Sequence, residues 1–128
     1  MLIVIEEVNK TNQEYEILFN SAYGSAHAYW DGDEPQVGKQ YNVEFGFPEG
    51  LRFGVEVVES QENKLSVFEV DRKMAFCALL EDVEEDGFTS FRMDNSLLVA
   101  DVEGKPLPNN IFVNVIPEKI VFYDQHYY

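Results

Sequence analysis

The chain has 128 residues, which fits one domain, 1–128, and allows a hydrophobic core without disulfide staples. Apolar residues at 45% and aromatic residues at 14%, with ten Phe and seven Tyr, exclude a disordered chain. Nine Lys and Arg against 24 Asp and Glu give a formal net charge of -15, which opposes binding to nucleic acid or anionic membranes and speeds encounter with a basic protein.

Cysteine usage and the opening residues bear on the cellular compartment. The only cysteine, Cys77, lies in an apolar run, so the sequence offers neither a disulfide framework nor a thiolate metal cluster. The opening sequence MLIVIEEV lacks the basic segment of a secretory signal, and no apolar run reaches the length of a membrane span. We expect a cytoplasmic protein with no cofactor and no membrane-spanning segment.

The first third of the chain predicts a hairpin and one further strand. Residues 1–8 are rich in β-branched side chains, a polar turn follows, and residues 14–19 carry Tyr, Ile and Phe at every second position. These two segments should pair as a first hairpin. Residues 26–30 predict another strand, which the turn sequence DGDEP at 31–35 ends.

The next segment predicts a second hairpin. Tyr41, Val43 and Phe45 alternate with polar residues, which indicates a strand with one face in the core. The sequence FPEG at 47–50 is typical of a turn, and residues 52–57 alternate again. We therefore expect residues 38–45 and 52–57 to pair with each other.

The stretch from residue 74 to residue 100 predicts the clearest hairpin of the chain. Asp86-Gly87 lies between two apolar runs, and this dipeptide is the usual centre of a two-residue type I′ turn. A two-residue loop would place Leu80 opposite Met93 and Glu81 opposite Arg92. The opposite charges of Glu81 and Arg92 support that pairing.

A helix over residues 72–85 is the competing prediction, because its apolar residues also fall at helical spacing. Arg72 and Lys73 would then lie at the positive end of the helix dipole, and the acidic run 81–86 would crowd the negative end. We favour the strand, and we keep the α+β fold with this helix as the alternative.

The remaining strands complete the fold prediction. Short strands are expected at 97–99, 111–116 and 120–123, with a loop holding two prolines at 103–110. We expect an all-β fold, a small antiparallel barrel or sandwich of about nine short strands. The order of a hairpin, a short strand, a loop and a closing strand in residues 74–124 resembles OB-like Greek-key barrels, a resemblance that names no family and implies no function.

Catalytic and metal motifs are missing from the sequence. There is no phosphate-binding glycine loop, nucleophile elbow, HExxH motif or paired CxxC. The turn at 31–34 has three carboxylates but not the further ligands of a calcium loop, and His27 and His126 have no motif context. We expect that the protein is not an enzyme, that Cys77 is a core residue, and that metal is not bound.

Two groups of residues are candidates for contact with a partner. The first is the densest acidic run of the chain, Glu81, Asp82, Glu84, Glu85 and Asp86. At a hairpin tip it could dock a surface rich in Lys and Arg. The second is the aromatic C-terminal segment, with Tyr123, Tyr127 and Tyr128, which could anchor a partner or a second copy of the chain.

These features lead to two functional hypotheses. The first is a non-catalytic acidic binding module that acts by protein contact, such as an inhibitor or immunity-type protein for a basic partner. The second is an OB-like barrel that binds an oligosaccharide or another small ligand by stacking on Tyr29, Trp30 and Tyr41. The missing basic groove argues against nucleic acid as that ligand.

Overall fold

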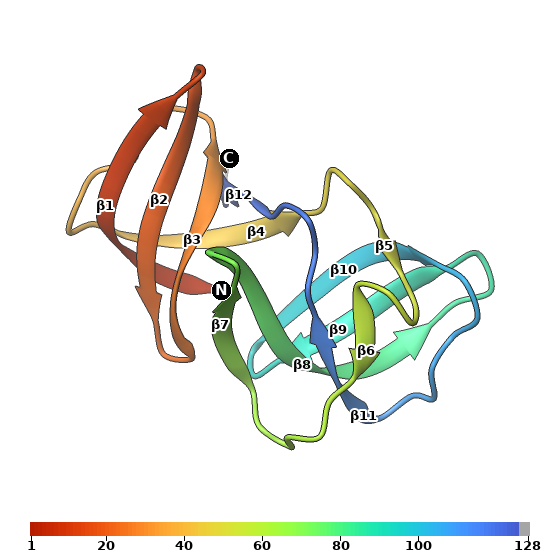
Figure 1. The fold of residues 1–128 in the computed structure, drawn as a ribbon. Helices are drawn as coiled ribbons and strands as arrows, with labels where there is room; N and C mark the ends of the chain where they lie inside the picture. The colour runs from red at the N-terminus through yellow and green to blue at the C-terminus, as the bar shows by residue number, and fades with distance from the viewer. Residues whose placement is uncertain (126–128) are drawn as a thin grey trace.

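The structure is a computed structural model, and residues 1–125 are described (Figure 1). These residues form twelve strands and no helix, which confirms the all-β prediction, although the strands outnumber the nine expected. The strands are β1 (Leu2–Thr11), β2 (Glu14–Ser21), β3 (Gly24–Asp31), β4 (Gln40–Gly46), β5 (Leu51–Arg52), β6 (Val57–Glu59), β7 (Ser66–Val70), β8 (Lys73–Val83), β9 (Phe88–Met93), β10 (Ser96–Glu103), β11 (Ile111–Val115) and β12 (Val121–Asp124).

The first barrel is closed and consists of β1, β2, β3, β12 and β4 in that order. Strand β1 pairs with both β2 and β4, and β12 runs parallel to β3 and antiparallel to β4. A first strand between the second and the fourth, with the last strand parallel to the third, is the order of an OB-like barrel. This order lies in the first barrel, which contains the predicted hairpin of β1 with β2, and not in residues 74–124, where the sequence predicted it. Of that range only β12 belongs to the first barrel.

The second sheet contains the remaining strands in the order β5, β10, β9, β8, β11, β6, and β7 pairs with the first half of β8. A parallel bridge between Phe53 and Val57 brings the β5 end of the sheet to the β6 end, so the second sheet is nearly closed. All its strands lie between β4 and β12 in the sequence, as the colours in Figure 1 show. The predicted closing strand at 120–123 therefore exists as β12, but it closes the first barrel.

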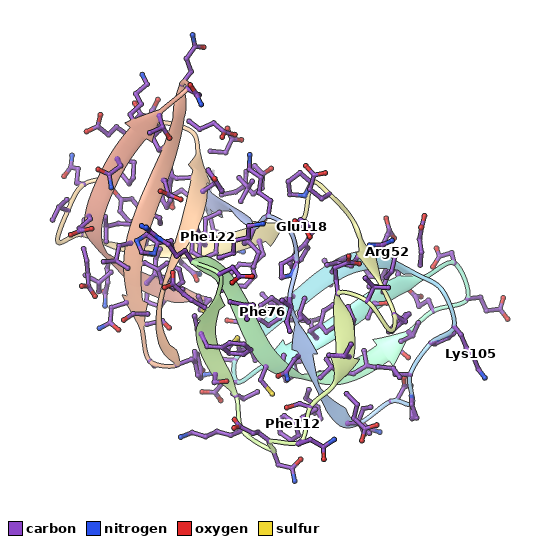
Figure 2. All side chains as sticks on the ribbon, in the orientation of Figure 1. Arg52, Phe76, Lys105, Phe112, Glu118 and Phe122 are labelled. Carbon is purple, nitrogen blue, oxygen red and sulfur yellow. The ribbon has the colours of Figure 1, made fainter. Side chains whose placement is uncertain are left out.

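A chain of aromatic rings joins the two units. Phe122 lies 5.0 Å from Phe19 and 4.9 Å from Phe45, measured between ring centroids. Phe45 lies 5.5 Å from Phe76, which in turn lies 6.4 Å from Phe91 in the second sheet. Figure 2 labels Phe122 and Phe76 along this path. The buried residues thus form one continuous core, while folding as a single domain stays a prediction.

The alternative prediction of a helix at 72–85 is wrong, because this segment is the long strand β8. Its residues Met74 to Ala78 are all buried, so side chains on both faces of this part of the strand are covered. A strand that is covered on both faces loses the alternation of apolar and polar residues. That loss is the reason why the segment also fits helical spacing.

The predicted hairpin of 38–45 with 52–57 is also wrong. Strand β4 pairs with β1 and β12 inside the first barrel, and β5 pairs in parallel with β10. The FPEG turn at 47–50 does not reverse the chain on the same sheet but carries it from the first barrel to the second sheet. Alternation fixes which face of a strand is buried, but it does not fix the neighbouring strand.

The hairpin of β8 with β9 is confirmed, but its turn and register differ from the prediction. Only Gly87 of the central dipeptide has a positive φ, at 91°, and the Glu84 N–H donates to the Phe88 carbonyl at 2.9 Å across a three-residue loop. A β-bulge at Glu81 shifts the register again, so Leu80 lies opposite Phe91 and not Met93. The expected contact of Glu81 with Arg92 forms nevertheless, through the side chains.

Candidate binding surface

The acidic run lies at the end of β8 and in the loop to β9. Asp82, Glu84, Glu85 and Asp86 are exposed, and Glu81 is half-buried. The Asp86 carboxylate accepts a hydrogen bond from the Phe88 N–H at 3.0 Å, which stabilises the loop. The run is therefore an ordered hairpin tip in which most carboxylates face solvent, as the sequence predicts.

Arg92 on β9 is already neutralised. Its Nε donates to Glu81 Oε2 at 2.7 Å and a terminal nitrogen donates to Oε1 at 3.2 Å, a bidentate ion pair. The hydrogen bond from Arg92 lowers the pKa of Glu81 below its ordinary value. Arg92 is the only Lys or Arg between residues 74 and 103, where eight Asp and Glu occur. Residues 74–103 thus contain no second Lys or Arg that could neutralise the remaining carboxylates of this segment.

Three exposed apolar side chains share a face with these carboxylates. The register places Val99 beside Ser90 and Asp82, Leu97 beside Arg92, and Phe88 beside Asp101, all on the outer side of the sheet. Leu97, Val99 and Phe88 are 48%, 43% and 37% exposed. We call this surface the acidic face and define it as Glu81, Asp82, Phe88, Leu97, Val99 and Asp101, with the hairpin tip 84–86 at its end.

The predicted tyrosine anchor is not brought to the acidic face within the described residues. Tyr123 is exposed on β12 of the first barrel, where its ring packs over Gly46. The acidic run belongs to the second sheet. Tyr127 and Tyr128 lie outside the described residues.

The residues expected to stack on a ligand fall into two classes. Trp30 and Tyr41 are 5% and 9% exposed, and their rings meet edge to face at 4.9 Å in the core. The Trp30 Nε1–H donates to the Asp33 carbonyl at 2.8 Å, so its polar atom is also satisfied. Tyr29 faces outward, with the Lys119 ammonium 4.3 Å from its ring centroid. Trp30 and Tyr41 also line an open hollow of about 450 Å³ beside residues 31–36, but they present little surface there, whereas Tyr29 is half-buried.

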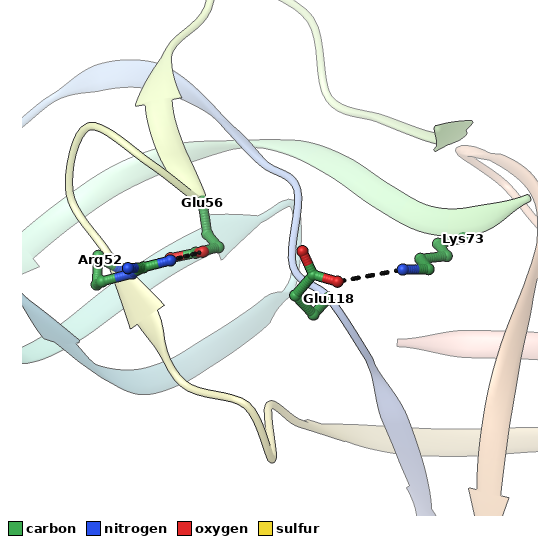
Figure 3. A network of polar contacts seen from close by, with 4 residues as sticks. All are labelled: Arg52, Glu56, Lys73 and Glu118. Atoms are coloured by element: carbon green, nitrogen blue, oxygen red, sulfur yellow. Dashed lines mark hydrogen bonds and ion pairs between the residues drawn. The ribbon is translucent and has the colours of Figure 1, made fainter. Parts of the chain in front are cut away.

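Tyr29 lies in a cleft of about 310 Å³ where the first barrel meets the second sheet. Buried Ala28, Met74 and Ile120 belong to its apolar lining. At its rim Lys73 donates to Glu118 at 3.2 Å (Figure 3). The cleft combines segments near residues 28, 73 and 119, and no local motif could have predicted it.

His27 also lines this cleft and is held by Glu69 on β7. The Glu69 carboxylate accepts the His27 N–H at 2.8 Å and lies 2.6 Å from Nδ1 of the ring. Burial by itself raises the pKa of Glu69, but the hydrogen bonds from His27 outweigh it and leave the pKa lowered. This pair ties β3 of the first barrel to β7 of the second sheet. His126, the other histidine, lies outside the described residues.

Residues 1–125 contain the other residue types that could hold a metal ion or react as a thiol. No group of three or more His, Cys, Asp or Glu side chains in that range is placed to hold a metal ion, and no helix there could cross a membrane. Cys77 is buried with its Sγ 3.5 Å from the Ser60 hydroxyl. Comparison with known proteins found no matching family model, no matching curated protein and no matching solved structure.

Proposed function

We propose that this protein is a non-catalytic binding module that docks its acidic face on a basic protein, as an inhibitor or immunity-type protein does. The observation that carries the proposal is the register of β8, β9 and β10, which groups exposed Leu97, Val99 and Phe88 with unbalanced carboxylates on one surface. An apolar centre with a charged rim is the usual composition of a protein interface.

Electrostatics and burial would have separate roles in this contact. The net charge of -15 and the hairpin tip speed the approach of a basic partner, an effect that salt weakens. Burial of Leu97, Val99 and Phe88 would then supply the salt-independent part of the affinity. Because Arg92 is engaged by Glu81, it does not repel the partner as a free cation would.

The test is affinity capture from the native host, followed by quantitative binding with the purified partner at several salt concentrations. We expect a partner rich in Lys and Arg, whose affinity for the protein falls as the salt concentration rises. Replacement of Glu84 and Glu85 by Gln and of Asp86 by Asn should weaken binding about tenfold or more. Recovery of free monomer alone, or an affinity that does not change with salt, would contradict the proposal.

The matched control removes the same number of carboxylates elsewhere. Glu6 and Glu7 on β1 and Glu34 in the loop between β3 and β4 are exposed residues outside the second sheet. Their replacement by Gln changes the net charge by the same amount and should reduce affinity less. Equal losses in the two variants would show a general charge effect and not a defined surface.

A second candidate function is binding of a small ligand in the cleft that Tyr29 lines. It is favoured by the apolar lining from Ala28, Met74 and Ile120 beneath an outward-facing aromatic ring. Titration with an oligosaccharide panel, followed by NMR shifts of Ala28 and Met74, tests it. Shifts that disappear in Tyr29→Ala support the candidate, and unchanged spectra across the panel contradict it.

A further inference from the structure

Strand β10 has a free main-chain edge along the acidic face. The Val102 N–H donates to the Gly87 carbonyl at 3.0 Å, so the even-numbered residues of β10 direct their main-chain groups toward β9. The main-chain groups of Leu97 and Val99 therefore point away from β9. On that side β5 pairs only with Val102 and Glu103. Within residues 1–125, the main-chain groups of Leu97 and Val99 have no hydrogen-bond partner.

Open space borders this edge. Among residues 1–125, a cleft of about 300 Å³ is lined on one side by residues 95–99 and on the other by residues 42–45 of β4, together with Met1 and Gln125. Hydrogen bonds between Val43 and Met1 show that odd-numbered residues of β4 direct their main-chain groups away from β12. The main-chain groups of Phe45 thus point to the same side of β4 as Val43, and no described residue forms a hydrogen bond with them. Both walls of the cleft offer unpaired main-chain groups.

The charges around this edge favour a positively charged segment as its binding partner. Among residues 1–125, Glu44 is the only charged side chain in the lining of the cleft, and the Met1 ammonium, which donates to Asn42 Oδ1 and to the Val43 carbonyl, is the only cation there. Natural edge strands are commonly protected by Lys or Pro, whereas the sequence here is SLLVAD. A second copy of the chain would bring another -15 of charge to the edge. A basic extended segment would meet carboxylates instead.

We propose that an extended, Lys- or Arg-bearing segment of the partner adds as a strand to the β10 edge at Leu97 and Val99. The inference rests on the proposed function and specifies how the partner is held. Main-chain hydrogen bonds to Leu97 and Val99 fix the segment, and its basic side chains reach Glu44 on one side and the acidic face on the other. Strand addition of this kind gives affinity through the main chain and selectivity through alternate side chains.

The experiment uses the full chain and a defined probe, a blocked octapeptide of alternating Lys and Val. Amide hydrogen exchange of the protein is followed by NMR with and without the peptide at low salt. We expect the Leu97 and Val99 amides to exchange about tenfold more slowly when the peptide is bound, because their N–H groups then have acceptors. Amides on the far side of the first barrel should not change.

The matched control peptide has the same sequence with alternate amides N-methylated, so it keeps the charge but cannot pair as a strand. Equal binding of both peptides overturns strand addition, while leaving the acidic face as a docking surface. No binding of either peptide at about 1 mM overturns strand addition as well. The proposed function is tested separately by the partner captured from the host.

A protein variant provides a second test. Val99→Pro removes an N–H that no strand of the fold uses, so the sheet should stay intact while affinity for the peptide falls about tenfold. Val99→Thr keeps the N–H and should bind as the native protein does. Slow exchange at Leu97 and Val99 that depends on protein concentration without peptide would show that a second copy occupies the edge, and would overturn the proposal.

Discussion

The first barrel and the second sheet differ in how completely their edge strands are paired. In the first barrel β1, β2, β3, β12 and β4 form a closed circle. The second sheet is closed only through a bridge at Phe53, and its end strands β5 and β6 have two and three residues. Such short strands cannot cover β10, which has eight residues. The exposed edge and the acidic face therefore both belong to the unit whose closure is incomplete.

An ion pair between exposed Arg52 and buried Glu56 holds the incomplete closure in place. Glu56 is 6% exposed, and it accepts hydrogen bonds from the Arg52 side chain at 3.1 and 2.6 Å and from the Arg52 N–H at 2.9 Å (Figure 3). Arg52 ends β5, and Glu56 directly precedes β6. This short loop keeps the two ends of the sheet together. The first barrel is thus closed by strand pairing, whereas the Arg52–Glu56 pair, which we call the polar clasp, holds the ends of the second sheet together.

The largest effect is expected where the two units share a core. Phe76→Ala removes a fully buried ring that contacts Phe45 and Phe91, and we expect a loss of about 4 kcal/mol in the free energy of unfolding. Denaturant unfolding can be followed by Trp30 fluorescence for the first barrel and by thiol labelling of Cys77 for the second sheet. Coincident transitions would support a single domain, and separate midpoints in the native protein would contradict it.

Phe112→Ala is the control for Phe76→Ala, because it also removes a phenylalanine ring but at a position away from the junction of the two units. Phe112 lies on β11, is only half-buried, and is labelled in Figure 2 away from the junction. Phe112→Ala should cost less than half as much as Phe76→Ala, because less apolar surface returns to water. Similar losses for the two variants would show that the junction has no special role in stability.

The next largest loss of stability is expected for a substitution at Gly24, where the two units are in close contact. Gly24 has a φ of 140°, and a Cβ there would overlap the Val67 carbonyl oxygen on β7. We expect Gly24→Ala to cost about 3 kcal/mol by displacing β7 from the first barrel, measured by thermal unfolding. Gly32→Ala, at a φ of 113° with no atom within 4 Å, controls for backbone strain and should cost about 1 kcal/mol.

The polar clasp predicts a pH-dependent effect. The Arg52 hydrogen bonds lower the pKa of Glu56 below its ordinary value of 4.5. Stability from this group is therefore fully present above that value and is lost as the pH falls through the lower folded-state pKa. Glu56→Gln should cost about 1.5 kcal/mol at pH 7, a modest figure because Arg52 is 58% exposed in its side chain.

The measurement for the clasp is urea unfolding of the native protein and of Glu56→Gln at pH 7 and at pH values below the ordinary carboxyl range. The difference in unfolding free energy should shrink as the pH falls. A difference that stays constant with pH would mean that Glu56 acts by packing and not by its charge.

The smallest effect is expected at the exposed ion pair of the acidic face. Arg92→Gln should leave the midpoint of unfolding nearly unchanged, because exposed ion pairs contribute little. The pKa of Glu81 should rise toward its ordinary value when the Arg92 hydrogen bond is lost. Carboxyl titration by NMR measures this, and a pKa of Glu81 that does not move would show that the ion pair does not form in solution.

Local patterns were sufficient for much of the fold. The alternation in residues 14–19 predicts β2, and the segment 26–30 predicts β3. The dipeptide Asp86-Gly87 predicts the hairpin of β8 with β9. The acidic run could be placed at a hairpin tip because both flanking strands were recognised. The predicted register of β8 with β9 is wrong by one residue at the turn and by a further residue at Glu81. Neither the three-residue loop nor the β-bulge has a clear sequence signal here.

The sequence by itself determined the all-β class, the first hairpin, the approximate location of most strands and the location of the charge, because these follow from side-chain alternation and turn residues within a few positions. The tertiary structure alone decided which unit each strand joins, that β12 closes the first barrel, that Trp30 and Tyr41 are core residues, and that within residues 1–125 no strand pairs with β10 at Leu97 and Val99 on the side away from β9. The physical reason is that strands pair through main-chain N–H and C=O groups, which all residues except proline share. The sequence of a strand therefore does not indicate which distant segment lies beside it.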